Sequence, residues 1–193
     1  MRDIPGEAEF RASGAAMRLY HRGGSTVYRG ALRSAVPDNG VGRDTVSIVS
    51  LETYLRGVVP AEVPALWSLH AVRAQAVAAR TYALRGAGGT GYYDTCDTTA
   101  CQAYRGFGVR NSNGTVTSYE HANSTAAVDA TDRQVLTYDF GSGVRQLATT
   151  MYSSSTGGHT TVGGPGHGYL TAHPDPYDAV ATNYRNAWNA QLP

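Results

Sequence analysis

The chain contains no lysine, and all sixteen of its Lys and Arg positions are arginine. Fifteen acidic residues balance them, and the formal net charge is only +1. A near-neutral chain without a cluster of basic residues has no electrostatic footprint for a polyanion. Nucleic acid is therefore not expected among its partners.

Long apolar stretches and large aliphatic residues are also scarce. No run of the sequence approaches the length of a membrane span, and the N-terminus has no basic and apolar leader. Leu, Ile, Val and Phe together make up less than a fifth of the chain, which would indicate disorder if the net charge were large. Because the charge is low and thirteen tyrosines add surface that can be buried, we expect residues 1–193 to fold as one compact domain.

Residues 1–49 and residues 50–193 differ in their pattern. The first part has the alternation of short strands separated by turn sequences, and it is predicted to form a β meander. The second part contains a long alanine-rich helix over 68–86. The sequence therefore predicts an α+β, loop-rich fold in which a mixed short-strand sheet or partial barrel packs on this helix. The expected strands are 15–20, 26–34, 45–50, 135–138 and 144–152, a short helix is expected over 124–132, and the expected core stripe of the long helix is Val72, Ala76, Ala79 and Ala83.

Glu62 lies between two prolines, in the run VVPAEVP at 58–64. Proline disfavours helix for the residue before it, so Val59 and Val63 are expected to be extended, in a rigid turn that follows a short helix over 51–57 capped by Ser50. A carboxyl held against these valines loses hydration, which favours the protonated form that can donate a proton near neutral pH. The simpler interpretation is a solvated loop residue or a helix cap, since acids are mostly exposed.

Several segments carry a resemblance to a known family. The run YLRGVVPAEVP at 54–64, followed by HAVRAQAVAARTYAL at 70–84, resembles the signature of the SpoIID/LytB family of peptidoglycan-active proteins. Ordered matches across most of the chain are more specific than any one short motif. The later matching segments are YDTCDTTACQAYRG at 93–106, NSTAAVDATDRQVLTYDFG at 123–141, MYSSSTGGHT at 151–160 and DPYDAVATNYRNAW at 175–188.

The resemblance implies a lytic transglycosylase in which Glu62 is the single catalytic acid. In such an enzyme the nucleophile is the 6-hydroxyl of the substrate's own muramic acid, so one carboxyl first donates and then accepts a proton. A first alternative is a non-catalytic module that binds glycan and stimulates a cell-wall amidase, as the name "amidase enhancer" of some relatives implies. A second is a hydrolase, in which Asp132 or Asp178 supplies the second carboxylate that most glycosidases need.

Neutral hydrogen-bonding side chains are expected around a sugar on which positive charge develops. Arg80, on the long helix, is expected to fix the Glu62 turn through charge-assisted hydrogen bonds. The small hydroxyl residues and paired glycines at 153–158 suit close approach of a glycan, although a polar turn is the simpler interpretation. The predicted substrate-binding residues are Gln75, Arg80, Tyr82, Gln102, Tyr104, Ser154, Ser155, Thr156 and His159.

Cys96 and Cys101 are the two cysteines of the chain. Two thiols cannot complete a four-ligand zinc site and no histidine lies near them in sequence, so neither a metal nor another cofactor is expected. The resemblance implies an extracytoplasmic protein of the cell wall, secreted or anchored through a segment outside this sequence. In that setting a local disulfide is predicted, with a reduced pair as the alternative and a catalytic thiol least favoured.

Overall fold

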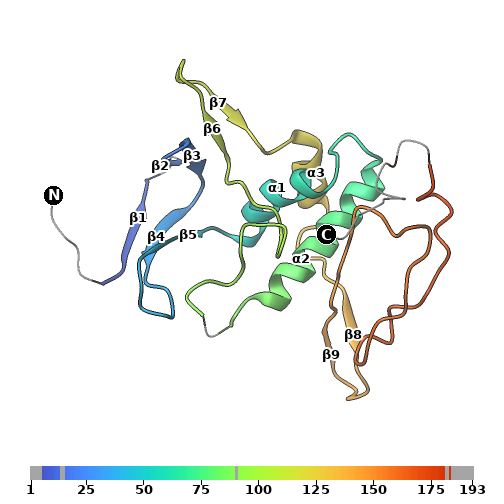
Figure 1. Cartoon of the computed structure of the whole chain (residues 1–193). Coiled ribbons are helices and arrows are strands. Elements are labelled where there is room, and N and C mark those ends of the chain that lie inside the picture. Colours follow the sequence, from blue (N-terminus) through green and yellow to red (C-terminus); the bar gives the residue numbers. More distant parts are fainter. Residues whose placement is uncertain (1–5, 14–15, 90, 181–182, 184–193) are drawn as a thin grey trace, which may run out of the picture. The chain divides into compact units, whose positions relative to one another are not determined.

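The computed structural model describes residues 6–13, 16–89, 91–180 and 183, in two compact units, Met1–Leu136 and Thr137–Pro193. The α+β class is confirmed, since helices and small antiparallel sheets make up the described residues, among which no sheet closes into a barrel (Figure 1). The predicted division at residue 49 lies inside the first unit. Within the described residues, no helix combines the length and the apolar character needed to cross a bilayer.

Two antiparallel sheets lie in the N-terminal unit. One has the strand order β1-β4-β5 and the other the order β2-β3-β6-β7. Their strands are β1 (Ala8–Arg11), β2 (Met17–His21), β3 (Gly24–Tyr28), β4 (Ala31–Ala35), β5 (Asp44–Ile48), β6 (Gly108–Arg110) and β7 (Val116–Ser118).

The single strand predicted over 26–34 is wrong, because this segment forms parts of β3 and β4, which belong to different sheets. The chain changes sheets at Gly30, whose φ of 75° is readily adopted only by glycine. A Cβ at this position would also run into the carbonyl oxygen of Ile48. The break therefore depends on a close backbone approach that strand alternation does not reveal.

The helices described in this unit are α1 (Leu51–Glu62), α2 (Leu69–Gly86) and α3 (Ala122–Ala130). Figure 1 shows α1 and α3 beside the long α2, and each helix contacts the other two. The predicted core stripe of α2 is confirmed, because all four of its residues are buried. The core comprises Tyr54, Leu55, Val58, Val59, Val63, Val72, Ala76, Ala79, Ala83, Tyr104, Ala127 and Val128.

The predicted extended turn over 58–64 is wrong, because α1 continues through Pro60 to Glu62 and only Val63 is extended, at φ −137° and ψ 139°. Proline inside a helix costs roughly 3 kcal/mol. Val58 and Val59 are both fully buried, and each buried valine contributes roughly 1.5 kcal/mol or more. Core burial thus offsets the local preference of proline, and Glu62 lies at the end of a helix.

Arg80 of α2 joins the three helices through its guanidinium, which is fully buried. Its Nε and Nη2 donate to the two carboxylate oxygens of Glu52 in α1, at 2.8 and 2.7 Å. Nη2 also donates to the carbonyl of Val128 in α3 at 3.1 Å, and Nη1 donates to the carbonyl of Gln134 at 3.2 Å. The bidentate pair and the two carbonyls fix α1 and α3 against α2.

The C-terminal unit contains one hairpin, β8 (Thr137–Asp139) paired with β9 (Arg145–Leu147). Both strands are shorter than predicted, since residues 148–152 form no strand. The Tyr169 hydroxyl accepts from the Thr149 N–H at 2.6 Å and donates to the Thr149 carbonyl at 3.0 Å. Side-chain contacts of this kind, more than sheet pairing, order the irregular chain that follows the hairpin.

Glu52→Gln is expected to destabilise the protein by about 3 kcal/mol, because it leaves the buried Arg80 guanidinium without a counter-charge. The matched control is Asp129→Asn, which removes a carboxylate from an ion pair with Arg56 at 3.1 Å whose side chains are 53% and 35% exposed. Exposed pairs of this kind contribute at most about 1 kcal/mol. Urea unfolding of both variants makes the comparison, and equal losses would contradict the assigned role of Arg80.

Candidate functional site

Glu62 is the last residue of α1, and its side chain is half-buried. Its Oε1 accepts a hydrogen bond from the backbone N–H of Ala103 at 2.7 Å. No other hydrogen bond to this carboxyl occurs among the described residues, so Oε2 has no hydrogen-bond partner there. The contact also joins the sequence segment 54–64 to the segment 93–106. The carboxyl is oriented through one oxygen and can exchange a proton through the other.

The connection from α1 to α2 exposes an aromatic ring close to Glu62 in the chain. The backbone N–H of Trp67 donates to the carbonyl of Pro64 at 3.0 Å, which closes a tight turn. Trp67 is 61% exposed and its neighbour Leu66 is 79% exposed. The flat face of an exposed indole can stack on the C–H face of a sugar ring. Trp67 is not among the residues predicted from the sequence, although a tryptophan in a loop between two amphipathic helices is a usable signal.

Two predicted substrate contacts, Arg80 and Gln102, are fully buried. A ligand has no access to side chains without exposed surface. The hydrogen bonds expected from Arg80 to Glu62 do not occur in the described part of the chain, because Arg80 pairs with Glu52 instead. The structure therefore gives Arg80 a positioning role.

Gln102 has a similar positioning role beside the candidate acid. Its Oε1 accepts from the hydroxyl of Tyr54 at 3.2 Å, and its Nε2 donates to the carbonyl of Ala79 at 3.2 Å. These bonds fix the chain between α1 and α2. Because Ala103 is the next residue, they also hold the N–H that binds Glu62.

Gln75 and Tyr82 lie on α2 and are half-buried. The Nε2 of Gln75 is a buried donor that has no hydrogen-bond partner among the described residues. Tyr104 is buried, and its ring lies over Gly57 and packs on Tyr54 with ring centres 4.9 Å apart. Burial raises the pKa of Tyr104. A Cβ at Gly57 would lie 2.9 Å from this ring, so the glycine permits the contact and does not end the helix as predicted.

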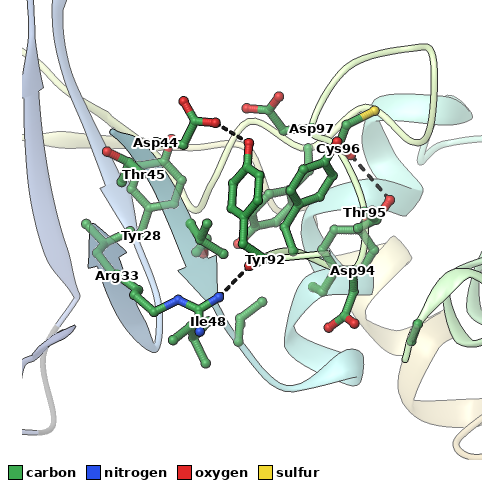
Figure 2. A pocket seen from close by; sticks show the side chains of 18 of the residues that line it. Tyr28, Arg33, Asp44, Thr45, Ile48, Tyr92, Asp94, Thr95, Cys96 and Asp97 are labelled. Carbon is green, nitrogen blue, oxygen red and sulfur yellow. Dashed lines mark hydrogen bonds between the residues drawn. The ribbon is translucent and has the colours of Figure 1, made fainter. Parts of the chain in front are cut away.

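Tyr104 also lines a pocket of about 800 Å³ in the N-terminal unit, drawn in Figure 2. Glu62 is not among the residues that line this pocket. The pocket and the candidate acid are therefore separate features of the same unit.

Four predicted residues, Ser154, Ser155, Thr156 and His159, lie in the C-terminal unit. Ser155 Oγ donates to Asp178 Oδ2 at 2.7 Å, and Thr156 Oγ1 donates to Asp175 Oδ2 at 3.0 Å. The sequence segment 151–160 therefore contacts Asp175 and Asp178, which begin the segment 175–188; residues 181–182 and 184–188 of that segment lie outside the described residues. Ser154 and His159 are exposed, whereas the other two hydroxyls are engaged by carboxylates.

The two alternative second carboxylates have other partners. Asp178 accepts from Ser155 Oγ, from the N–H of Gly158 at 3.1 Å and from Asn183 Nδ2 at 2.9 Å, so it holds a loop together. Asp132 is 52% exposed and pairs with Arg133 at 3.4 Å. Neither arrangement favours a nucleophile or base for a hydrolase.

Cys96 and Cys101 form a disulfide, with a Cα–Cα distance of 5.5 Å. The bridge closes a short loop directly before Gln102. In the described part of the chain, no three His, Cys, Asp or Glu side chains gather as metal ligands.

Comparison with known proteins gives a match to the SpoIID family, described as stage II sporulation protein, over residues 39–138. The segments at 151–160 and 175–188 lie beyond this match. No solved structure matches the chain.

Two relatives extend this comparison. Over 106 residues, 55% of this chain, the sequence is 43% identical to a protein of Bacillus subtilis (strain 168) named amidase enhancer. Over 124 residues, 61% of this chain, it is 35% identical to an uncharacterized protein of Brachyspira hyodysenteriae (strain ATCC 49526 / WA1). The matches span only 12% and 29% of the length of these two relatives.

Proposed function

The chain belongs to the SpoIID family, and from that premise we propose that it cleaves peptidoglycan glycan strands as a lytic transglycosylase with Glu62 as its single acid and base. The observation that carries the proposal is the oriented, half-buried carboxyl at the end of α1, held by the Ala103 N–H at 2.7 Å. We also propose an extracytoplasmic location at the cell wall, since peptidoglycan lies outside the cytoplasmic membrane.

The proposed reaction needs one carboxyl and no water. Because Oε1 of Glu62 accepts from Ala103, the proton is carried on Oε2. Glu62 donates it to the β-1,4 glycosidic oxygen as the bond from that oxygen to C1 of the muramic acid breaks. The 6-hydroxyl of the same sugar then bonds to C1 and gives its proton to the Glu62 carboxylate. The products are a free 4-hydroxyl and a 1,6-anhydromuramyl end, and the acid is regenerated.

Positioning supports this role for Glu62. A helix end buried through Val58 and Val59 is stiffer than a loop, and the Ala103 N–H that orients the carboxyl is held through Gln102. Acid catalysis depends on such fixed geometry, because a misplaced group loses much of its effect.

Glycan contacts are proposed from the side chains that a ligand can reach. Trp67 offers a stacking face, and Gln75 is only half-buried on α2. Tyr82 remains in the proposal as a further polar contact of the N-terminal unit. The C-terminal unit by itself has its own proposed polar contacts with glycan, which are Ser154, Ser155, Thr156 and His159.

A second candidate function is a glycan-binding module that stimulates a cell-wall amidase without cleaving glycan. The observation that favours it is the name of the Bacillus subtilis relative, amidase enhancer, at 43% identity. In this alternative the partner is an amidase, and Glu62 contributes hydrogen bonds only.

Glu62→Gln tests the two functions against each other. The amide oxygen can still accept from the Ala103 N–H, so fold and glycan binding should persist. We expect release of soluble fragments from purified glycan strands to fall by about 10²- to 10⁴-fold, the usual contribution of a general acid. Asp132→Asn, which removes an exposed carboxylate, is the matched control and should retain full activity. An undiminished release by Glu62→Gln would exclude the catalytic proposal, and retained stimulation of an amidase would favour the alternative.

Trp67→Ala is expected to weaken binding of a chito-oligosaccharide about tenfold, because it removes the stacking face. Trp67→Phe should retain most of the affinity. The control is Tyr20→Ala, which truncates an aromatic residue that is 70% exposed on β2. Since the chain has two tryptophans, a Trp188→Phe background makes Trp67 the sole indole reporter, and its emission should shift on titration. If Trp67→Ala and Tyr20→Ala bind the oligosaccharide with equal affinity, Trp67 is not part of the glycan site.

A further inference from the structure

A pocket of about 800 Å³ in the N-terminal unit has no part in the proposed reaction. Its walls come from β4 and β5, the first turn of α1, the end of α2 and the segment 91–97. Figure 2 shows its aromatic and acidic side chains close together. Its tyrosines are Tyr28, Tyr54, Tyr92, Tyr93 and Tyr104, and its carboxylates are Asp44, Asp94 and Asp97.

The charge of the lining is unbalanced. Three aspartates face one cation, Arg33. The Arg33 guanidinium is already engaged, since it donates to the carbonyl of Tyr92 and lies 4.0 Å from the Glu7 carboxylate. Negative charge therefore exceeds positive charge around the cavity, which disfavours an anionic ligand and attracts a cation.

Two of the lining tyrosines, Tyr28 and Tyr92, have a raised pKa, which favours their neutral form. The hydrogen bond to Asp44 raises the pKa of Tyr92 to about 12. Burial, with a smaller contribution from the Asp97 charge, raises the pKa of Tyr28. Tyr92 and Tyr93 form an edge-to-face pair with ring centres 4.8 Å apart. Neutral aromatic faces beside carboxylates are the surroundings in which proteins hold organic cations.

Asp97 is held in position by the loop that carries it. The Cys96–Cys101 disulfide closes this loop, and the carbonyl of Asp97 accepts from the Tyr104 N–H at 3.1 Å. A carboxylate on a constrained loop loses little conformational entropy when it binds a ligand.

We propose that this pocket binds a ligand bearing a primary ammonium group, through the carboxylates of Asp44 and Asp97 and the rings of the neighbouring tyrosines. Such a group is carried by an unacetylated amino sugar and by the side chain of a basic amino acid in a peptide. Both sources share the same chemistry, an alkylammonium on a flexible or cyclic carbon skeleton. The proposal stands apart from the reaction at Glu62, which does not line the pocket.

Calorimetric titration of the full chain with two matched ligand pairs tests the proposal. One pair is the glucosamine tetrasaccharide and its fully N-acetylated form, and the other is Nα-acetyl-Ala-Lys-Ala and the same peptide acetylated also at Nε. We expect one free amine to bind at least about tenfold more tightly than its acetylated partner, and the affinity to fall as salt is raised. The pair that responds identifies the source of the ammonium group.

Asp44→Asn and Asp97→Asn should each weaken that binding about tenfold. The first variant keeps an acceptor for the Tyr92 hydroxyl, and the second leaves the backbone bond of Asp97 intact. Asp132→Asn, which removes the same charge outside the pocket, should bind normally, and so should Glu62→Gln. Three results would each overturn the proposal. They are equal binding of both members of each pair, no binding of either amine at millimolar concentration, and full affinity in both pocket variants. A Glu62→Gln protein that binds the amine normally and still cleaves glycan would refute the proposed transglycosylase reaction. The assignment of the pocket would stand.

Discussion

The bidentate pair between Arg80 and Glu52 is the constraint on which the helical core depends. A guanidinium without exposed surface must have its charge and its donors satisfied, because an unpaired buried charge costs several kcal/mol. Glu52, the Val128 carbonyl and the Gln134 carbonyl meet that requirement, and they come from α1, from α3 and from the segment that follows α3. The alanines of α2 leave room for this approach, so a slim helix and one arginine together set the positions of α1 and α3.

The position of α1 in turn determines that of Glu62. The helix continues through Pro60 because Val58 and Val59 are buried beneath it, and it therefore presents the carboxyl from a rigid end. The Ala103 N–H then orients the carboxyl by donating to its Oε1. A chain with few large aliphatic residues thus obtains a fixed acid through buried polar contacts as much as through apolar packing.

Sequence patterns predicted the features that depend on local periodicity, and missed those that depend on burial. The α+β class and the core stripe from Val72 to Ala83 follow from periodicity and are confirmed. The helix through Pro60 was missed because tertiary burial outweighs a local preference. Gln102 was predicted as a glycan contact because the sequence does not show whether a polar residue of a motif faces a ligand or a neighbouring helix. The assignment of Glu62 as catalytic stays a prediction, supported by its geometry.

The central claim is that a single carboxyl cleaves the glycan and that the nucleophile belongs to the substrate. Mass spectrometry of fragments released from peptide-free glycan strands in water enriched in heavy oxygen tests it most directly. A transglycosylase gives 1,6-anhydromuramyl ends that contain no label, since no water enters the reaction. Reducing ends, heavier by one water and carrying the heavy oxygen, would show a hydrolase and exclude Glu62 as the single acid and base of a transglycosylase.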